Sequence, residues 1–236
     1  MRIVFAVLLF LITRIATADQ FLIASASEAK ELFWSKLYPG AGWTLYCGDY
    51  FQSNTRVDID HIYSLSWAAK ALHCSDIEQC QRDNSRFNRI ASDLHNLYPA
   101  RPMIIRARKD YRFGLIPGEF REFFECDFEN SVHDRIAEPR LSARGNIARA
   151  LFYMRAQYGL PIDANMLALL KEWSLADPPS KDEVRRNEVI ERLQGTRNTF
   201  IDNPRLANVL LDNARINNAP TDTAQRETDI QFLQTY

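Results

Sequence analysis

Residues 56–63 read RVDIDHIY, a segment in which apolar residues and His61 alternate with charged residues. A period of two is typical of a half-buried β-strand, and it predicts a strand that ends near Tyr63. Asp60 and His61 stand side by side close to that end. Because consecutive residues of a regular strand face opposite sides, these two side chains share one site only where the strand ends, bends or bulges.

A helix is expected about 25 residues later, at positions 86–97, with Asn84 or Ser85 as its N-cap. Successive helical residues are about 100° apart. The stripe that faces the core therefore consists of Phe87, Ile90, Leu94 and Leu97. Asn96 falls on the opposite side of this helix, and Arg89 falls on the same side as Asn96.

Asp60, His61 and Asn96 supply the chemical groups that hydrolysis of a phosphodiester requires. A neutral histidine can deprotonate water, and a cation can neutralise the phosphate. A carboxylate and a carboxamide oxygen are hard ligands that suit magnesium. The same helix geometry nominates Arg89 as a phosphate contact. By itself an Asp-His dipeptide is a very weak motif, and it is more often a surface or core pair than a site.

The remaining periodic segments favour a single, mainly helical α+β domain whose few strands lie in the first half of the chain. Ser180 and Glu183 form a capping box that opens a helix closed by Gly195. The expected helices are 26–38, 145–158, 163–175, 181–194 and a last one that begins at Pro204. The expected strands besides 56–63 are 43–51, 111–115 and 123–128.

The N-terminus is typical of a secretory signal peptide over residues 1–18. Arg2 precedes an apolar run at 3–12, and Ala16-Thr17-Ala18 is a small-x-small cleavage site. A membrane anchor needs about twenty apolar residues, and Arg14 makes this run too short. We expect export, with no membrane association after cleavage. The mature domain is predicted at 19–216, and the polar segment 217–236 is expected to be disordered.

The charge of the chain does not indicate a general nucleic-acid binder. Its 236 residues carry a formal net charge of −1, with 29 basic and 30 acidic residues, and removal of residues 1–18 leaves 27 basic residues. Proteins that bind nucleic acid without specificity do so mainly by neutralising phosphates. One run is basic, however, and its cations are Arg101, Arg106, Arg108, Lys109 and Arg112. Taken alone, such a run is usually a solvated face.

The four cysteines are an even number in a chain that we expect to be exported, which suggests two disulfides. Three pairings are possible. Cys74 and Cys80 are close enough to close a small loop, which would leave Cys47 to pair with Cys126. A zinc site is the weaker reading, because the sequence contains no Cys-x2-Cys pair.

Several short sequence motifs, called the ordered words below, occur in an order that makes the Asp60-His61 pair more significant than it is alone. They are Asp60-His61-Ile62, Asp93-Leu94-His95-Asn96-Leu97-Tyr98-Pro99, Glu138-Pro139, Arg144-Gly145-Asn146-Ile147-Ala148-Arg149, Phe152-Tyr153-Met154-Arg155, Asp177-Pro178-Pro179, Glu183, Arg186-Asn187 and Leu193-Gln194-Gly195-Thr196-Arg197-Asn198-Thr199-Phe200-Ile201-Asp202. Across roughly residues 26–205, this ordered set resembles the endonuclease I family of periplasmic and secreted bacterial nucleases.

The resemblance implies a ββα-metal (His-Me finger) active site inside a largely helical domain. It implies cleavage of DNA, and often RNA, with little sequence preference and with 5′-phosphate products. His61 matches the general base, Asn96 matches a metal ligand, and Asp60 stands where the family usually has a glutamate ligand. The expected cofactor is Mg²⁺, with Mn²⁺ or Ca²⁺ as substitutes. We expect a periplasmic or secreted monomer.

The resemblance also assigns a role to the basic run, because Arg108 matches a family arginine that follows the His-Asn-Leu word. Arg101, Arg106, Arg108 and Lys109 would then form a surface for the DNA backbone. One family arginine is missing, since the stretch 75–79 before Cys80 contains none. Its substitute would be one of Arg82, Arg86 and Arg89, of which the helical geometry favours Arg89.

Two other readings remain. The first is a family member with weakened catalysis that acts as an exported nucleic-acid-binding homologue, which is favoured by Asp60 and by the missing arginine. The second is an exported, disulfide-stapled interaction protein in which the Asp60-His61 pair has no role.

Overall fold

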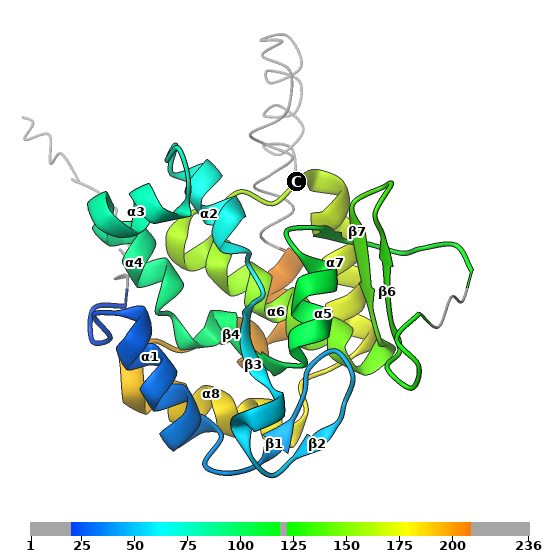
Figure 1. The fold of residues 1–236 in the computed structure, drawn as a ribbon, viewed down its shortest axis with the longest axis horizontal. Helices are drawn as coiled ribbons and strands as arrows, with labels where there is room; N and C mark the ends of the chain where they lie inside the picture. Colours follow the sequence, from blue (N-terminus) through cyan, green and yellow to red (C-terminus); the bar gives the residue numbers. More distant parts are fainter. Residues whose placement is uncertain (1–19, 119–121, 209–236) are drawn as a thin grey trace, which may run out of the picture.

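The computed structural model of the protein describes residues 20–118 and 122–208 (Figure 1). The α-helices of these ranges are α1 (Ala26–Leu32), α2 (Leu65–Ala71), α3 (Ile77–Asp83), α4 (Ser85–Ala91), α5 (Pro102–Arg108), α6 (Leu141–Tyr158), α7 (Ala164–Ala176), α8 (Lys181–Gln194) and α9 (Thr199–Asp202). The shorter helical turns are the π-helical η1 (Phe33–Leu37) and the 3₁₀ turns η2 (Asn54–Arg56), η3 (Leu94–Asn96) and η4 (Pro204–Leu206). The predicted signal peptide and the predicted disordered tail lie outside the described residues.

The strands form three small sheets among the helices. They are β1 (Gly42–Trp43), β2 (Tyr50–Phe51), β3 (Asp58–His61), β4 (Leu97–Ala100), β5 (Arg112–Phe113), β6 (Phe128–Ser131) and β7 (Ile136–Pro139). β1 pairs with β2, β3 pairs antiparallel with β4, and β7 lies between β5 and β6. The mainly helical α+β class expected from the sequence is confirmed.

Helix α6 forms the centre of the larger hydrophobic core and is surrounded by the other elements in Figure 1. Its apolar residues from Ile147 to Met154 are almost completely buried. Arg149 of α6 is buried as well, and its guanidinium binds the carboxylate of Glu183 on α8. A buried ion pair of this kind holds together two helices that are distant in sequence.

A second, smaller core lies on the other side of the β3–β4 ribbon. It is built from α1, η1 and α8, and Ile59 of β3 packs against it together with Leu94 and Leu97. Because β3 lies between two cores, its alternate residues are buried on opposite faces.

The sequence-based helix at 181–194 coincides with α8. The Ser180 hydroxyl accepts a hydrogen bond from the Glu183 amide at 3.1 Å, as the predicted cap requires. The Glu183 carboxylate contacts Arg149 instead of returning to the cap. Helices at the predicted positions 26–38, 145–158 and 163–175 are also confirmed.

The helix predicted at 86–97 is wrong at its end, because α4 stops at Ala91. The Asp93 side chain accepts a hydrogen bond from the His95 amide and caps the separate turn η3. Asn96 ends that turn, and β4 begins at the next residue. Asn96 therefore does not share a helical face with Arg89.

Other boundaries also differ from the sequence-based expectations. The segment 43–51 is two short strands joined by a turn, and the last helix begins as the 3₁₀ turn η4. Helices α2, α3, α5 and α9 and strands β4 and β7 were not anticipated. The strand expected at 123–128 is wrong, because β6 begins only at Phe128, and β6 and β7 lie in the second half of the chain and not in the first. α5 begins at Pro102, a residue suited to the first position of a helix.

Both disulfides expected from the cysteine spacing are present. Cys47 is bonded to Cys126 across 79 residues, and Cys74 is bonded to Cys80. Two structural disulfides are compatible with an oxidising compartment. No helix within the described ranges combines the length and the apolar character that crossing a membrane requires.

Candidate active site

His61 is the last residue of β3, and its ring is held against the end of α4. Its Nε2 lies 2.9 Å from the carbonyl oxygen of Ala91. A carbonyl oxygen only accepts hydrogen bonds, so Nε2 carries the proton and Nδ1 has the lone pair of the neutral ring. Nδ1 makes no hydrogen bond in the described residues and is not among their buried unpaired atoms, so it reaches solvent. The ring is oriented as a general base requires.

Burial lowers the pKa of His61 below its usual 6.5. The hydrogen bond to Ala91 and the charge of Asp60 act in the opposite direction but do not offset the loss of solvation. The neutral, proton-accepting form of His61 is therefore favoured at neutral pH.

Asp60 lies on the opposite face of β3, in a buried cluster with Tyr46 and Arg108. The Tyr46 hydroxyl donates to Oδ2 of Asp60 at 2.6 Å. Nη1 of Arg108 donates to the same oxygen at 3.0 Å and to Oδ1 at 3.2 Å. Burial raises the pKa of Tyr46 well above its usual value, so its hydroxyl remains a donor. Asp60 is only 6% exposed.

Arg108 also binds the backbone next to Asp60. Nη1 donates to the His61 carbonyl at 2.8 Å, and Nη2 donates to the Ile62 carbonyl at 2.5 Å. Its side chain is 1% exposed and packs over the rings of Phe113 and Trp67. Arg108 does not lie on the DNA-binding surface predicted for it, because its charge is used inside the protein to hold the end of β3.

Asn96 continues the β3–β4 ladder with its side chain. Oδ1 accepts a hydrogen bond from the Tyr63 amide at 2.6 Å, and Nδ2 donates to the Tyr63 carbonyl at 3.0 Å. The backbone carbonyl of Asn96 accepts from the Ile62 amide. Asn96 is completely buried, and its contacts hold the chain where it leaves β3 for α2.

The contacts of Asp60 and Asn96 do not form a ready site for a metal ion. Both carboxylate oxygens of Asp60 accept hydrogen bonds, and the only oxygen of the Asn96 side chain is bonded to Tyr63. Within residues 20–118 and 122–208, no group of three or more His, Cys, Asp or Glu side chains is placed to hold a metal. In addition, β3 and β4 pair regularly up to His61 opposite Leu97. Asp60 and His61 therefore face opposite sides of the β3–β4 ribbon.

Asp93 is a buried hub that sequence reasoning did not identify. It is fully buried and accepts four hydrogen bonds, from the His95 amide, the Gln194 amide group and the hydroxyls of Tyr153 and Tyr158. Nε2 of His95 donates a hydrogen bond to the Thr196 carbonyl, and burial lowers the pKa of His95 to about 4. These contacts give His95 a structural role beside Asn96.

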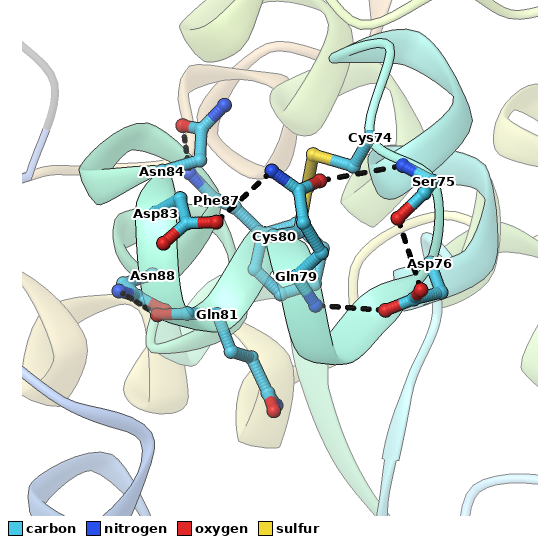
Figure 2. Close-up of a disulfide and its surroundings, with 10 residues drawn as sticks. All are labelled: Cys74, Ser75, Asp76, Gln79, Cys80, Gln81, Asp83, Asn84, Phe87 and Asn88. Atoms are coloured by element: carbon cyan, nitrogen blue, oxygen red, sulfur yellow. Dashed lines mark hydrogen bonds between the residues drawn. A yellow bond between two sulfur atoms is a disulfide. The ribbon is translucent and has the colours of Figure 1, made fainter.

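The small disulfide loop contains acids where the resembled family has an arginine. Figure 2 shows Asp76 accepting hydrogen bonds from the Gln79 amide and the Ser75 hydroxyl beside the Cys74–Cys80 bond. These hydrogen bonds lower the pKa of Asp76 and keep it ionised. A negative loop of this kind does not attract a phosphate.

The substitutes considered for the missing arginine lie near α4. Arg86 donates to the Tyr158 carbonyl, and the guanidinium of Arg89 lies 5.1 Å from the centre of the Phe21 ring. Arg82 is exposed near the end of α3. None of these contacts places a guanidinium beside His61, so Arg89 stays a prediction as a phosphate contact.

The basic run 101–112 is divided by the fold into buried and exposed parts. Arg101 is bonded to Asp49 through two nitrogens, at 2.6 and 2.5 Å. Arg106 and Lys109 are exposed on and just after α5. Only the exposed cations remain available to a nucleic-acid backbone.

Comparison with known proteins agrees with the ordered words of the sequence. Residues 16–205 match the model of the family described as Endonuclease I. The chain belongs to the endonuclease I family. A periplasmic deoxyribonuclease of Aeromonas hydrophila is 36% identical over 62% of this chain and 63% of its own length.

Two further relatives of the endonuclease I chain are named as extracellular nucleases. An extracellular deoxyribonuclease of Aeromonas hydrophila is 35% identical over 52% of this chain and 58% of its own length. An extracellular ribonuclease of Bacillus amyloliquefaciens is 32% identical over 49% of this chain and 45% of its own length. The chain therefore spans about three fifths or less of these relatives.

Within this endonuclease I chain, the sequence indicated His61 and Asp60 but missed the groups that orient them. The Ala91 carbonyl and the Tyr46 hydroxyl carry no sequence signal, since neither belongs to a motif. Arg108 was visible as a cation, but charge alone does not distinguish a buried cation from an exposed one.

We expect Arg108→Ala to destabilise the protein by about 3–5 kcal/mol, because it leaves the buried Asp60 carboxylate without its cation. Urea unfolding followed by circular dichroism measures this change. Arg106→Ala removes an exposed cation from the same helix and should change stability by less than about 0.5 kcal/mol. Weaker DNA binding by Arg108→Ala at unchanged stability would instead support the surface role.

Asn96→Asp separates a bracing role from a ligand role. The new side chain keeps an oxygen ligand, but as an ionised carboxylate it cannot donate to the Tyr63 carbonyl as the amide does, and it is buried. We expect a loss of about 1–3 kcal/mol in metal-free buffer, measured by urea unfolding. The control is Asn165→Asp, the same change at an exposed position of α7. Undiminished stability together with full activity would favour the ligand role.

Proposed function

We propose that this chain is an exported nuclease that hydrolyses phosphodiester bonds of nucleic acid, with His61 as its general base. The observation that carries the proposal is the hydrogen bond from Nε2 of His61 to the Ala91 carbonyl. It leaves Nδ1 as the proton acceptor and aims the ring toward solvent. Membership of the endonuclease I family supports the same chemistry.

The residues around His61 account for its activation. The Ala91 carbonyl stabilises the imidazolium that forms when Nδ1 takes a proton from water. Arg108 binds the His61 carbonyl and Asn96 binds the Tyr63 amide, so the backbone that carries the His61 ring is held in place. A base contributes to rate only when it is positioned against the attacking water.

The substrate is proposed to be DNA, RNA or both, cleaved with little sequence preference to give 5′-phosphate ends. Relatives named as deoxyribonucleases and as a ribonuclease support this range. Arg106 and Lys109 are the exposed cations proposed to contact the backbone, and Arg89 remains the proposed phosphate contact. The disulfides and the names of these relatives support a periplasmic or secreted location.

A divalent ion, with Mg²⁺ as the predicted one, would supply the charge that neutralises the phosphate and the leaving oxygen. The present contacts of Asp60 and Asn96 do not favour their joint use as ligands of that ion. The same contacts favour, as the second candidate function, the weakened homologue that binds nucleic acid without cutting it.

We expect the purified protein to nick supercoiled plasmid and to degrade RNA, and we expect His61→Ala to slow both reactions about 100-fold or more. Gel electrophoresis of timed digests in Mg²⁺ and in EDTA measures cleavage and its dependence on metal. His133→Ala is the control, because His133 is exposed and distant in sequence from the site.

Intact plasmid that is nevertheless retarded on a gel would contradict the nuclease and support the binding homologue. Cleavage that continues in EDTA would contradict the predicted Mg²⁺ dependence while leaving His61 as the base. Neither cleavage nor retardation would favour the interaction protein.

The pH profile should reflect the lowered pKa of His61. The base works only when neutral, so activity should be retained as pH falls to 6.5 and be lost at lower pH, where the ring becomes protonated. Initial cleavage rates between weakly acidic and neutral pH measure this loss of activity, which forms the acid limb of the pH profile. His133→Ala is expected to give the same profile as the wild-type protein. An acid limb centred above 6.5 would mean that His61 is not the group that titrates.

A further inference from the structure

A cavity of about 470 Å³, whose lining does not include His61, is formed by residues of the β1–β2 arm and of helix α8. The arm and α8 lie near each other in Figure 1. The cavity walls combine aromatic rings with guanidinium groups, and they include Trp43, Tyr50, Tyr98, Arg140, Arg185 and Arg186. We propose that this cavity, the arm groove, binds single-stranded nucleic acid, with bases stacked on Trp43 and Tyr50. The choice of nucleic acid as the ligand rests on the proposed function, but binding in the arm groove does not require that the protein cleaves it.

The first observation is the pair of exposed rings on the arm. Trp43 and Tyr50 stand directly opposite each other in the β1–β2 pairing, so both side chains project from the same face. They are 59% and 53% exposed, and their ring centres are 5.1 Å apart. Two adjacent aromatic faces on a polar surface indicate contact with a flat, partly apolar ligand.

The second observation is the guanidinium of Arg186 in the same wall. Its Nη2 donates to the Leu94 and Leu97 carbonyls, both at 2.6 Å, and the group stacks on the Tyr98 ring at 4.1 Å. Its Nε and Nη1 are buried, and the Tyr38 hydroxyl interacts with the same guanidinium. Arg186 therefore contributes a fixed positive charge to the wall of the groove.

The charge of the wall favours an anion. Lys36, Arg140, Arg185 and Arg186 line the groove, whereas its acids are Asp182 and Glu183. Glu183 is buried and already bound to Arg149. The local charge is thus positive on a chain whose overall formal charge is −1, which gives an anionic ligand a reason to bind here.

Aromatic stacking selects for single strands. In a duplex the base faces are covered by their neighbours, whereas an unpaired strand exposes them to protein rings, and cations hold its backbone. The size of the groove is within the range of sites that enclose small ligands, so it accommodates one or a few nucleotides. A single-strand subsite of this kind would favour RNA and unwound DNA as substrates of the His61 centre.

The test is fluorescence anisotropy of a labelled oligothymidylate and of its duplex with oligoadenylate, measured in EDTA with the full chain carrying His61→Ala to prevent cleavage. We expect Trp43→Ala and Tyr50→Ala each to weaken single-strand binding about tenfold and to leave duplex binding unchanged. Trp43→Phe should restore most of the affinity because it restores a ring. Phe124→Ala, which removes a still more exposed ring outside the groove, should have no effect.

Charge is tested on α8 with a matched pair. Arg185→Glu should weaken single-strand binding and flatten its salt dependence, whereas Arg192→Glu, exposed on the same helix outside the groove, should retain it. Unchanged affinity in Trp43→Ala and Tyr50→Ala would reject the groove, as would no oligonucleotide binding by the parent protein. Ring-dependent binding without any plasmid cleavage by the wild-type chain would instead retain the groove and reject the nuclease.

Discussion

The buried guanidinium of Arg108 is the interaction on which the candidate site depends. From within the core it binds the Asp60 carboxylate and the carbonyls of His61 and Ile62. Pairing stabilises a buried charge. The Asp60 carboxylate and the Arg108 guanidinium supply it for each other, although Nε of Arg108 makes no hydrogen bond within the described residues. Because the pair fixes β3 from one face, the His61 ring on the other face meets the end of α4 at hydrogen-bond distance.

The parts of the fold that were predictable depend on local chemistry. The alternation in 56–63 predicted β3, and the cap at Ser180 predicted the start of α8. The helix through Asn96 was mispredicted because the apolar spacing continued past Ala91, while a buried polar hub at Asp93 determined the backbone. Hydrogen bonds between distant segments leave no periodic signal. For the same reason, the basic run could not reveal that Arg108 is buried.

The contacts of Asp93 show how several of the ordered sequence motifs contribute to the fold. Its carboxylate joins the Asp93–Pro99 word to the tyrosine of the Phe152-Tyr153-Met154 word and to the Gln194-Gly195 word. Arg149 and Glu183 join two further words. These residues of the resemblance therefore hold the fold, and they are needed whether or not the chain cleaves nucleic acid.

The two predicted metal ligands differ in what they would lose on binding an ion. An ionised carboxylate has about four acceptor positions, and Asp60 already receives Tyr46 and Arg108, so one position remains. Asn96 would have to release the Tyr63 amide, and an unpaired buried amide costs about 1–3 kcal/mol. Binding an ion would thus cost Asp60 fewer of its present contacts than it would cost Asn96. The His61 ring is already oriented for proton transfer, whereas Asp60 and Asn96 could bind an ion together only by giving up a present contact. The geometry therefore supports proton transfer at His61 more strongly than it supports ion binding by Asp60 and Asn96.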